Sequence, residues 1–155
     1  MHSNEQLIHD FYIGFRQLDW QAMAACYHRN IHFSDPVFTE LKGEDVHQMW
    51  RMLCSKAKDF ELQYRILMID DTHGSARCEA SYVFAQTGRR VHNVIFAEFQ
   101  FADGKIIRHS DHFSFWKWSF MALGAPGLLF GWSGFLRRKV QHTAAQGLAA
   151  FRRRN

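Results

Sequence analysis

A histidine and an aspartate, the residue types best suited to moving protons, stand two positions apart at His109 and Asp111. Alternate residues of a strand project to one face, so both side chains lie on the same face whatever the strand pairs with. An apolar face makes a carboxylate costly to bury and raises its pKa, as a general acid or base requires. The pair is a candidate acid–base couple, with a structural hydrogen bond or a position at the rim of the sheet as the alternative.

A second carboxylate, Asp35, precedes Pro36 after a short apolar segment. Asp-Pro commonly opens a turn, in which the aspartate accepts backbone hydrogen bonds, so a pocket carboxylate and a turn residue are both open interpretations. Tyr12 lies in a helical apolar pattern and is either core or a hydroxyl donor to a bound compound.

Several other chemistries lack their motifs. The chain has no GxSxG, GxxxxGK[ST] or GxGxxG sequence, which disfavours acyl hydrolases, P-loop proteins and dinucleotide binding. His28 and His32 are four apart but straddle an expected helix end, and the cysteines form no CxxC: Cys26, Cys54 and Cys78. We therefore expect no metal, no cofactor and no disulfide framework.

The first third of the chain has helical periodicity. A Ser3/Gln6 capping box predicts a helix to about Leu18, and Asp19 can cap a second helix from Trp20 to Tyr27. A short strand, 31–33, leads to Asp35, and a third helix follows Gly43.

From residue 60 the apolar period changes to two. The pattern predicts four strands separated by turn residues: Phe60–Asp70, Ser75–Gln86, Arg90–Phe101 and Lys105–Phe115. Three helices followed by an antiparallel meander define an α+β fold. Strands this long can curl, so we expect a cone in which the three helices pack on a curved sheet, with a C-terminal helical extension.

Charge suggests the strand register. A two-residue turn at Thr87-Gly88 and a three-residue loop at 102–104 place Arg77, Glu98 and Arg108 side by side on the outer face. The residues then expected to line an internal pocket are Trp50, Cys78, Tyr82, Asn93, Ile95, Ala97, Ile107 and Phe113.

The C-terminal part differs in charge from the rest. Residues 1–111 hold twelve Lys and Arg against fifteen Asp and Glu, whereas residues 112–155 hold seven Lys and Arg and no acid. We divide one structural domain into a cone over 1–118 and a basic helical extension over 119–155, which serves as a lid or dimer contact. Lys117 and the Gly124–Gly127 break disfavour a membrane span.

Interfacial membrane contact by this tail is a less favoured alternative, and nucleic acid is not expected as a partner. The N-terminal residues lack the basic and apolar segments of a signal peptide, from which we expect a cytoplasmic protein.

The order of elements, with Asp35-Pro36 after a short strand and GKIIRHSD ending at Asp111, resembles the nuclear-transport-factor-2-like superfamily. Its cone-shaped members include ketosteroid isomerases, limonene epoxide hydrolases and SnoaL-like polyketide cyclases. The resemblance covers about residues 4–118. It implies that Asp111 matches the catalytic acid of the cyclases, Asp35 the general base of the isomerases, and Tyr12 their oxyanion-hole tyrosine.

The chain also departs from these relatives. Ala97 stands where the isomerases have a second, protonated oxyanion donor, and Cys78 and Ala80 stand where the epoxide hydrolases have an arginine and an aspartate. The resemblance supports the fold more strongly than any one reaction.

Together, these observations predict a protein that binds a small, largely apolar ring compound. Asp111, oriented by His109, or Asp35 would act as base for an isomerisation or cyclisation. The alternative is a non-catalytic ligand-binding or accessory protein of the same fold. The outer sheet face, where Phe96 lies among charges, predicts a homodimer.

Overall fold

The N-terminal helices form close to where the sequence predicts them. The computed structural model describes residues 1–155, and its first helices are α1 (Ser3–Arg16), α2 (Trp20–Ala25) and α3 (Glu44–Lys56). Asp19 caps α2 by accepting the Ala22 N–H at 3.0 Å, as expected. The cap of α1 is His2 rather than Ser3, because the His2 ring accepts the Asn4 N–H at 3.0 Å and Ser3 is already helical.

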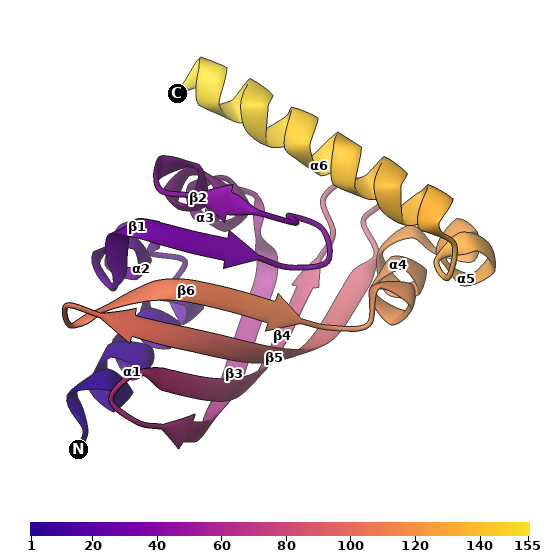
Figure 1. The fold of residues 1–155 in the computed structure, drawn as a ribbon. Helices are drawn as coiled ribbons and strands as arrows, with labels where there is room; N and C mark the ends of the chain where they lie inside the picture. The colour runs from indigo at the N-terminus through magenta and orange to yellow at the C-terminus, as the bar shows by residue number, and fades with distance from the viewer.

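Six strands form one curved sheet in the order β2-β1-β6-β5-β4-β3 (Figure 1). The strands are β1 (Tyr27–Ser34), β2 (Leu41–Lys42), β3 (Lys58–Ile69), β4 (His73–Val83), β5 (Arg90–Ala102) and β6 (Lys105–His112). With helices α1–α3 packed against it, the sheet confirms the expected α+β cone. The long meander β3–β6 follows the alternating pattern of the sequence.

One pairing was not expected. β1 lies beside β6 and runs parallel to it, with Phe33 opposite His109 and Ser34 opposite Ser110. The carboxyl ends of these two strands therefore lie at the same edge of the cone. Local periodicity cannot reveal this contact, because it joins segments about 75 residues apart.

The β4–β5 register differs from the expectation by two residues. Arg77 pairs with Phe96, and Glu98 pairs with Ser75. The reason is a longer loop over 85–88, closed by the Phe84 N–H donating to the Arg89 carbonyl at 2.8 Å. A shift of two leaves every side chain on its expected face.

The β5–β6 hairpin also differs. Asp103 and Gly104, both with positive φ (54° and 73°), form a two-residue turn rather than part of a three-residue loop. Ile107 is then the extra residue of a β-bulge, and the bulge returns His109 to the inner face. Ile106 is fully buried and belongs to the main core, whereas Ile107, expected to line the pocket, is partly exposed and lies outside that core.

Three helices follow the sheet: α4 (Phe115–Leu123), α5 (Ala125–Phe130) and α6 (Gly134–Arg154). α4 lies beside β5, and α6 runs back from α5 toward α3 (Figure 1). Leu148 and Phe151 of α6 belong to the main core, and Arg152 pairs with Asp45 at the start of α3. None of these helices is long and apolar enough to cross a membrane.

Two substitutions in α6, one at a buried and one at an exposed phenylalanine, test whether this helix packs on the core. Phe151→Ala should destabilise the protein by about 3 kcal/mol, because a buried ring is lost and a cavity is left. Phe135→Ala, in the same helix but 71% exposed, should change the free energy of unfolding by less than about 0.5 kcal/mol. Urea denaturation of both variants measures the difference, and equal effects would show that α6 is not part of the core.

Candidate functional site

A chain of four hydrogen-bonded side chains crosses the interior of the cone. Trp50 Nε1 donates to Tyr27 Oη at 3.0 Å, and Tyr27 Oη lies 2.8 Å from His109 Nδ1. His109 Nε2 in turn lies 2.8 Å from Asp111 Oδ1. The chain connects α3, β1 and β6, so it depends on the parallel pairing of β1 with β6.

One direction of donation satisfies every member of this chain. The indole can only donate, so Tyr27 accepts from Trp50 and directs its own hydrogen to His109 Nδ1. A neutral imidazole then carries its proton on Nε2 and donates to the Asp111 carboxylate. In this arrangement His109 holds one oxygen of Asp111, and the Tyr27 hydroxyl favours the His109 tautomer that does so.

Aromatic rings enclose His109, which is 1% exposed. Its ring centroid lies 4.5 Å from that of Phe99, 5.1 Å from Phe33 and 5.3 Å from Phe11. In this apolar shell an unpaired ring nitrogen would be costly, which accounts for the partners on both nitrogens.

Asp111 is the last of the four hydrogen-bonded side chains, and it is less enclosed than His109. Its side chain is 11% exposed, and its Oδ2 accepts no hydrogen bond from the protein. The small Ala97 lies directly opposite it on β5. The negative charge of Asp111 adds to burial in raising the pKa of Tyr12 and of Cys78, so both groups stay protonated near it.

Tyr12 differs from Tyr27 in its hydrogen bonding. Its ring is buried and stacks on Tyr64 with centroids 4.7 Å apart, but its hydroxyl has no hydrogen-bond partner in the protein. A phenol kept neutral by its surroundings and free to donate is suited to an oxygen atom of a bound compound.

Asp35 has the turn role that the sequence left open. Its Oδ1 accepts the N–H groups of Val37 and Phe38 at 2.7 and 2.6 Å, which makes it a turn residue. Burial nevertheless raises its pKa from 3.8 to about 7, with a smaller contribution from the charge of Asp111 and against the lowering effect of the two turn hydrogen bonds.

The two carboxylates occupy corresponding positions on neighbouring strands. Asp35 directly follows β1, and Asp111 ends the inner-face alternation of β6. The preceding residues of the two strands are paired, and Ser34 Oγ donates to Ser110 Oγ at 3.3 Å. The charge of Asp111 contributes to the raised pKa of Asp35, so the two groups interact electrostatically across the end of the cone.

The other expected lining residues divide between two regions. Cys78, Asn93, Ala97 and Trp50 are buried on the inner side, and Ile95 packs against the main core. Tyr82 packs against both the main core and α4, where Trp118 Nε1 donates to Tyr82 Oη at 3.0 Å, and Phe113 packs in the cluster of α4. The helical extension therefore covers the same end of the sheet at which the carboxylates lie.

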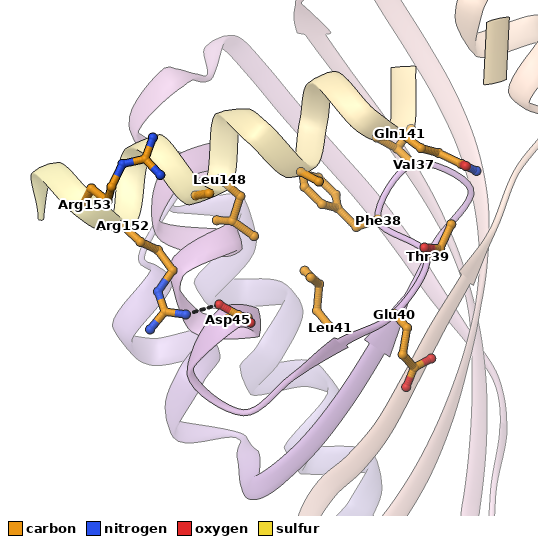
Figure 2. A pocket seen from close by; sticks show the side chains of 12 residues that line it. Val37, Phe38, Thr39, Glu40, Leu41, Asp45, Gln141, Leu148, Arg152 and Arg153 are labelled. Carbon is orange, nitrogen blue, oxygen red and sulfur yellow. Dashed lines mark hydrogen bonds and ion pairs between the residues drawn. The ribbon is translucent and has the colours of Figure 1, made fainter. Parts of the chain in front are cut away.

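The two main hollows lie elsewhere. One of about 610 Å³ separates α6 from the segment 37–41 and from Asp45 (Figure 2). The other, of about 450 Å³, lies on the outer sheet face beside Glu98 and Arg108. Neither is lined by Asp35, His109 or Asp111, and no three His, Cys, Asp or Glu side chains gather as metal ligands would.

The curved sheet, its three helices and the inward carboxylates define the cone-shaped class of α+β proteins. Residues 8–109 match the family model of the SnoaL-like domain, and the chain belongs to this family. No curated protein matches the sequence.

Solved structures share the fold at low sequence identity. TsrD from Streptomyces laurentii is 21% identical with a TM-score of 0.67, over 79% of this chain and 96% of its own. A putative polyketide cyclase from Silicibacter sp. TM1040 is 16% identical (TM-score 0.68, 76% and 93% covered). A putative isomerase from Bacillus subtilis is 13% identical (TM-score 0.68, 81% and 98% covered).

Tyr27 is the residue that sequence reasoning missed, since it was expected at the end of a helix. The sequence offers only a weak, indirect indication that Tyr27 belongs to a strand. Tyr27 begins the eight-residue β1, of which only Ile31–Phe33 gave a strand pattern. Its partner His109 lies 82 positions further along the chain.

The two buried tyrosines provide a test of the hydrogen-bonded chain. Tyr27→Phe removes the partner of Trp50 and of His109 Nδ1, and it should lower the free energy of unfolding by about 3 kcal/mol because two buried polar groups are left unpaired. Tyr12→Phe removes a hydroxyl that bonds nothing in the protein and should cost less than about 0.5 kcal/mol. Chemical denaturation measures the free energy of unfolding of both variants. Similar losses of stability in the two would contradict the hydrogen bonds of Tyr27 to Trp50 and His109.

Asp35 should make stability depend on pH in an unusual direction. Because its pKa is raised in the folded state, its contribution is full below about pH 4 and is lost as pH rises through about 7. The unfolding free energy of the wild type relative to Asp35→Asn should therefore fall between pH 4.5 and 7, by at most about 1.4 kcal/mol per pH unit.

Asp70 is a matched control for this experiment. It forms the same turn, accepting the N–H groups of Thr72 and His73, but it is exposed and those hydrogen bonds lower its pKa. Its contribution is present above the ordinary pKa and is lost only as pH falls below it. Asp70→Asn should therefore show no decline from pH 4.5 to 7, and a flat difference for Asp35→Asn as well would contradict its raised pKa.

Proposed function

We propose that this protein binds a small, largely apolar ring compound between the inner sheet face and helices α1 and α3, and catalyses proton transfer on it with Asp111 and Asp35. The observation that carries the proposal is the placement of two carboxylates at the ends of adjacent parallel strands, each with one oxygen held by the protein.

The roles follow from the surroundings of each group. Asp111 Oδ1 is held by His109, so its unbonded Oδ2 would remove a proton from a carbon next to a carbonyl group. Asp35, with a pKa of about 7, is partly protonated near neutral pH and can donate to the carbonyl oxygen or take the proton back. Tyr12 is a second donor to that oxygen.

The outcome depends on where the proton returns. Return to a different carbon of the same ring compound is an isomerisation, and attack of the enolate on a second carbonyl is a cyclisation. The fold is shared with a putative polyketide cyclase and a putative isomerase, which supports both reactions equally. No metal or redox cofactor is needed for either step.

A specific observation favours the alternative, ligand binding without turnover. Both ring nitrogens of His109 are hydrogen-bonded and aromatic rings enclose it, as in a purely structural network. The homodimer and the cytoplasmic location remain part of the proposal, and Phe96, half exposed on the outer face of β5, is the side chain that a dimer would cover.

Asp111→Asn separates the two functions. We expect the exchange of the α-protons of a bicyclic ketone, 2-tetralone, into D2O to be accelerated by the wild type and reduced on the order of 100-fold in this variant, because the base is lost. Stability should change by only about 1 kcal/mol, since an asparagine oxygen still accepts from His109. Proton NMR and thermal melting measure the two quantities.

Asp59→Asn is the matched control, because Asp59 is exposed and makes no hydrogen bond. It should leave exchange and stability unchanged. A folded Asp111→Asn variant with undiminished exchange would transfer the role of base to Asp35. No exchange by the wild type, with a large loss of stability in the variant, would favour the non-catalytic alternative.

A further inference from the structure

Helices α4, α5 and the start of α6 meet at one corner of the molecule (Figure 1). Exposed aromatic and aliphatic side chains are concentrated in these helices. Seven large apolar side chains here are 42–77% exposed, and we call them the apolar corner: Trp116, Phe120, Leu128, Leu129, Phe130, Trp132 and Phe135. Monomeric soluble proteins rarely expose so many large apolar residues together unless they bind something.

Close backbone packing holds this corner in shape. A Cβ on Gly127 would lie 2.0 Å from the Ser119 carbonyl oxygen, and one on Gly131 would lie 2.2 Å from Ser119 Oγ. Only glycine permits α5 to approach α4 this closely. Trp116 Nε1 also donates to the Leu128 carbonyl at 3.1 Å. The apolar side chains are thus presented by a fixed helical hairpin.

α4 is apolar on both faces. Phe115 and Trp118 pack inward against Val91 and Tyr82, while Trp116 and Phe120 point outward. Apolar side chains on a helix are normally covered by protein or lipid, so Trp116 and Phe120 on the outward face of α4 lack a cover.

The charge around the apolar corner indicates what kind of partner covers it. Residues 112–155 contain no acid, and exposed basic side chains accompany the apolar corner: Arg89, Arg90, Lys117, Arg137, Arg138 and Lys139. A second copy docking corner to corner would bring two such basic groups together and would be repelled. Exposed Trp and Phe beside Lys and Arg match the interface of an anionic membrane.

We infer that the apolar corner docks the protein onto an anionic lipid surface. The aromatic side chains would enter the boundary between headgroups and acyl chains, while Arg137, Arg138 and Lys139 contact lipid phosphates. The protein would lie on the membrane rather than span it, since no helix is long and apolar enough to cross.

Vesicle binding tests this inference with two lipid compositions. The wild type should sediment with vesicles of phosphatidylcholine containing roughly one third phosphatidylglycerol, and far less with phosphatidylcholine alone. Tryptophan fluorescence should shift to the blue on binding, because Trp132, 77% exposed, would leave water. High salt should weaken the binding.

Two sets of substitutions distinguish the apolar and the basic contributions. Trp132→Ser with Phe135→Ser should weaken binding at least about tenfold, because two interfacial anchors are removed. Arg137→Glu, Arg138→Glu and Lys139→Glu together should weaken it on the order of 100-fold or more. All five side chains are exposed or at the surface, so thermal melting should not change.

Matched controls lie on another part of the surface. Leu67→Ser with Met68→Ser removes two exposed apolar side chains (47% and 45% exposed) from β3. Lys56→Glu, Lys58→Glu and Arg65→Glu reverse the same number of exposed charges as the basic variant of the corner. Both control variants should bind anionic vesicles more tightly than the corresponding variants of the apolar corner and its basic residues.

Three results would overturn the inference. The wild type could stay in solution with both kinds of vesicle, or the corner and control variants could lose binding equally. Light scattering could also show a dimer that Trp132→Ser with Phe135→Ser dissociates, which would make a second copy the occupant of the corner. Each result is independent of the proton-transfer activity proposed above.

Discussion

The need to satisfy both nitrogens of one buried imidazole ties the interior of the cone together. His109 is enclosed by phenylalanine rings, so each unpaired nitrogen would carry the full cost of desolvation. Tyr27 meets one nitrogen from β1 and Asp111 meets the other from β6. Trp50 then fixes Tyr27 from α3. Four side chains thereby set the relation of one helix and two strands.

The bulge at Ile107 is part of the same constraint. A two-residue turn at Asp103-Gly104 without a bulge would direct His109 outward and Ser110 inward. The inserted residue restores the alternation, so that His109 and Asp111 both face the core. The inward orientation of His109 and Asp111 therefore depends on the bulge residue Ile107 in β6.

Much of this fold could be predicted from the sequence, because its signals are local. The Asp19 cap, the alternation of β3–β6 and the shared face of His109 and Asp111 all depend on neighbours within a few residues. The register of β4–β5 could not be predicted because loop geometry decides it. The β1–β6 pairing and the role of Tyr27 could not be predicted because they depend on contacts between residues more than 70 positions apart. Asp35 shows the same limit. The Asp-Pro sequence predicted its turn. The sequence could not predict that Asp111 influences its pKa, because that effect depends on the parallel pairing of β1 with β6.

Asp35 and Asp70 show that burial, not local geometry, determines the chemistry of a turn aspartate. Both accept two backbone N–H groups through Oδ1, and each donates its own N–H to a carbonyl three residues on. Those hydrogen bonds lower the pKa of exposed Asp70, yet burial outweighs them at Asp35 and raises the pKa to about 7. The C-terminal helix also contacts this turn, because the Gln141 side chain of α6 donates to the Pro36 carbonyl at 3.0 Å. The residue next to Asp35 is therefore held by a segment more than 100 positions away, which no local sequence pattern could reveal.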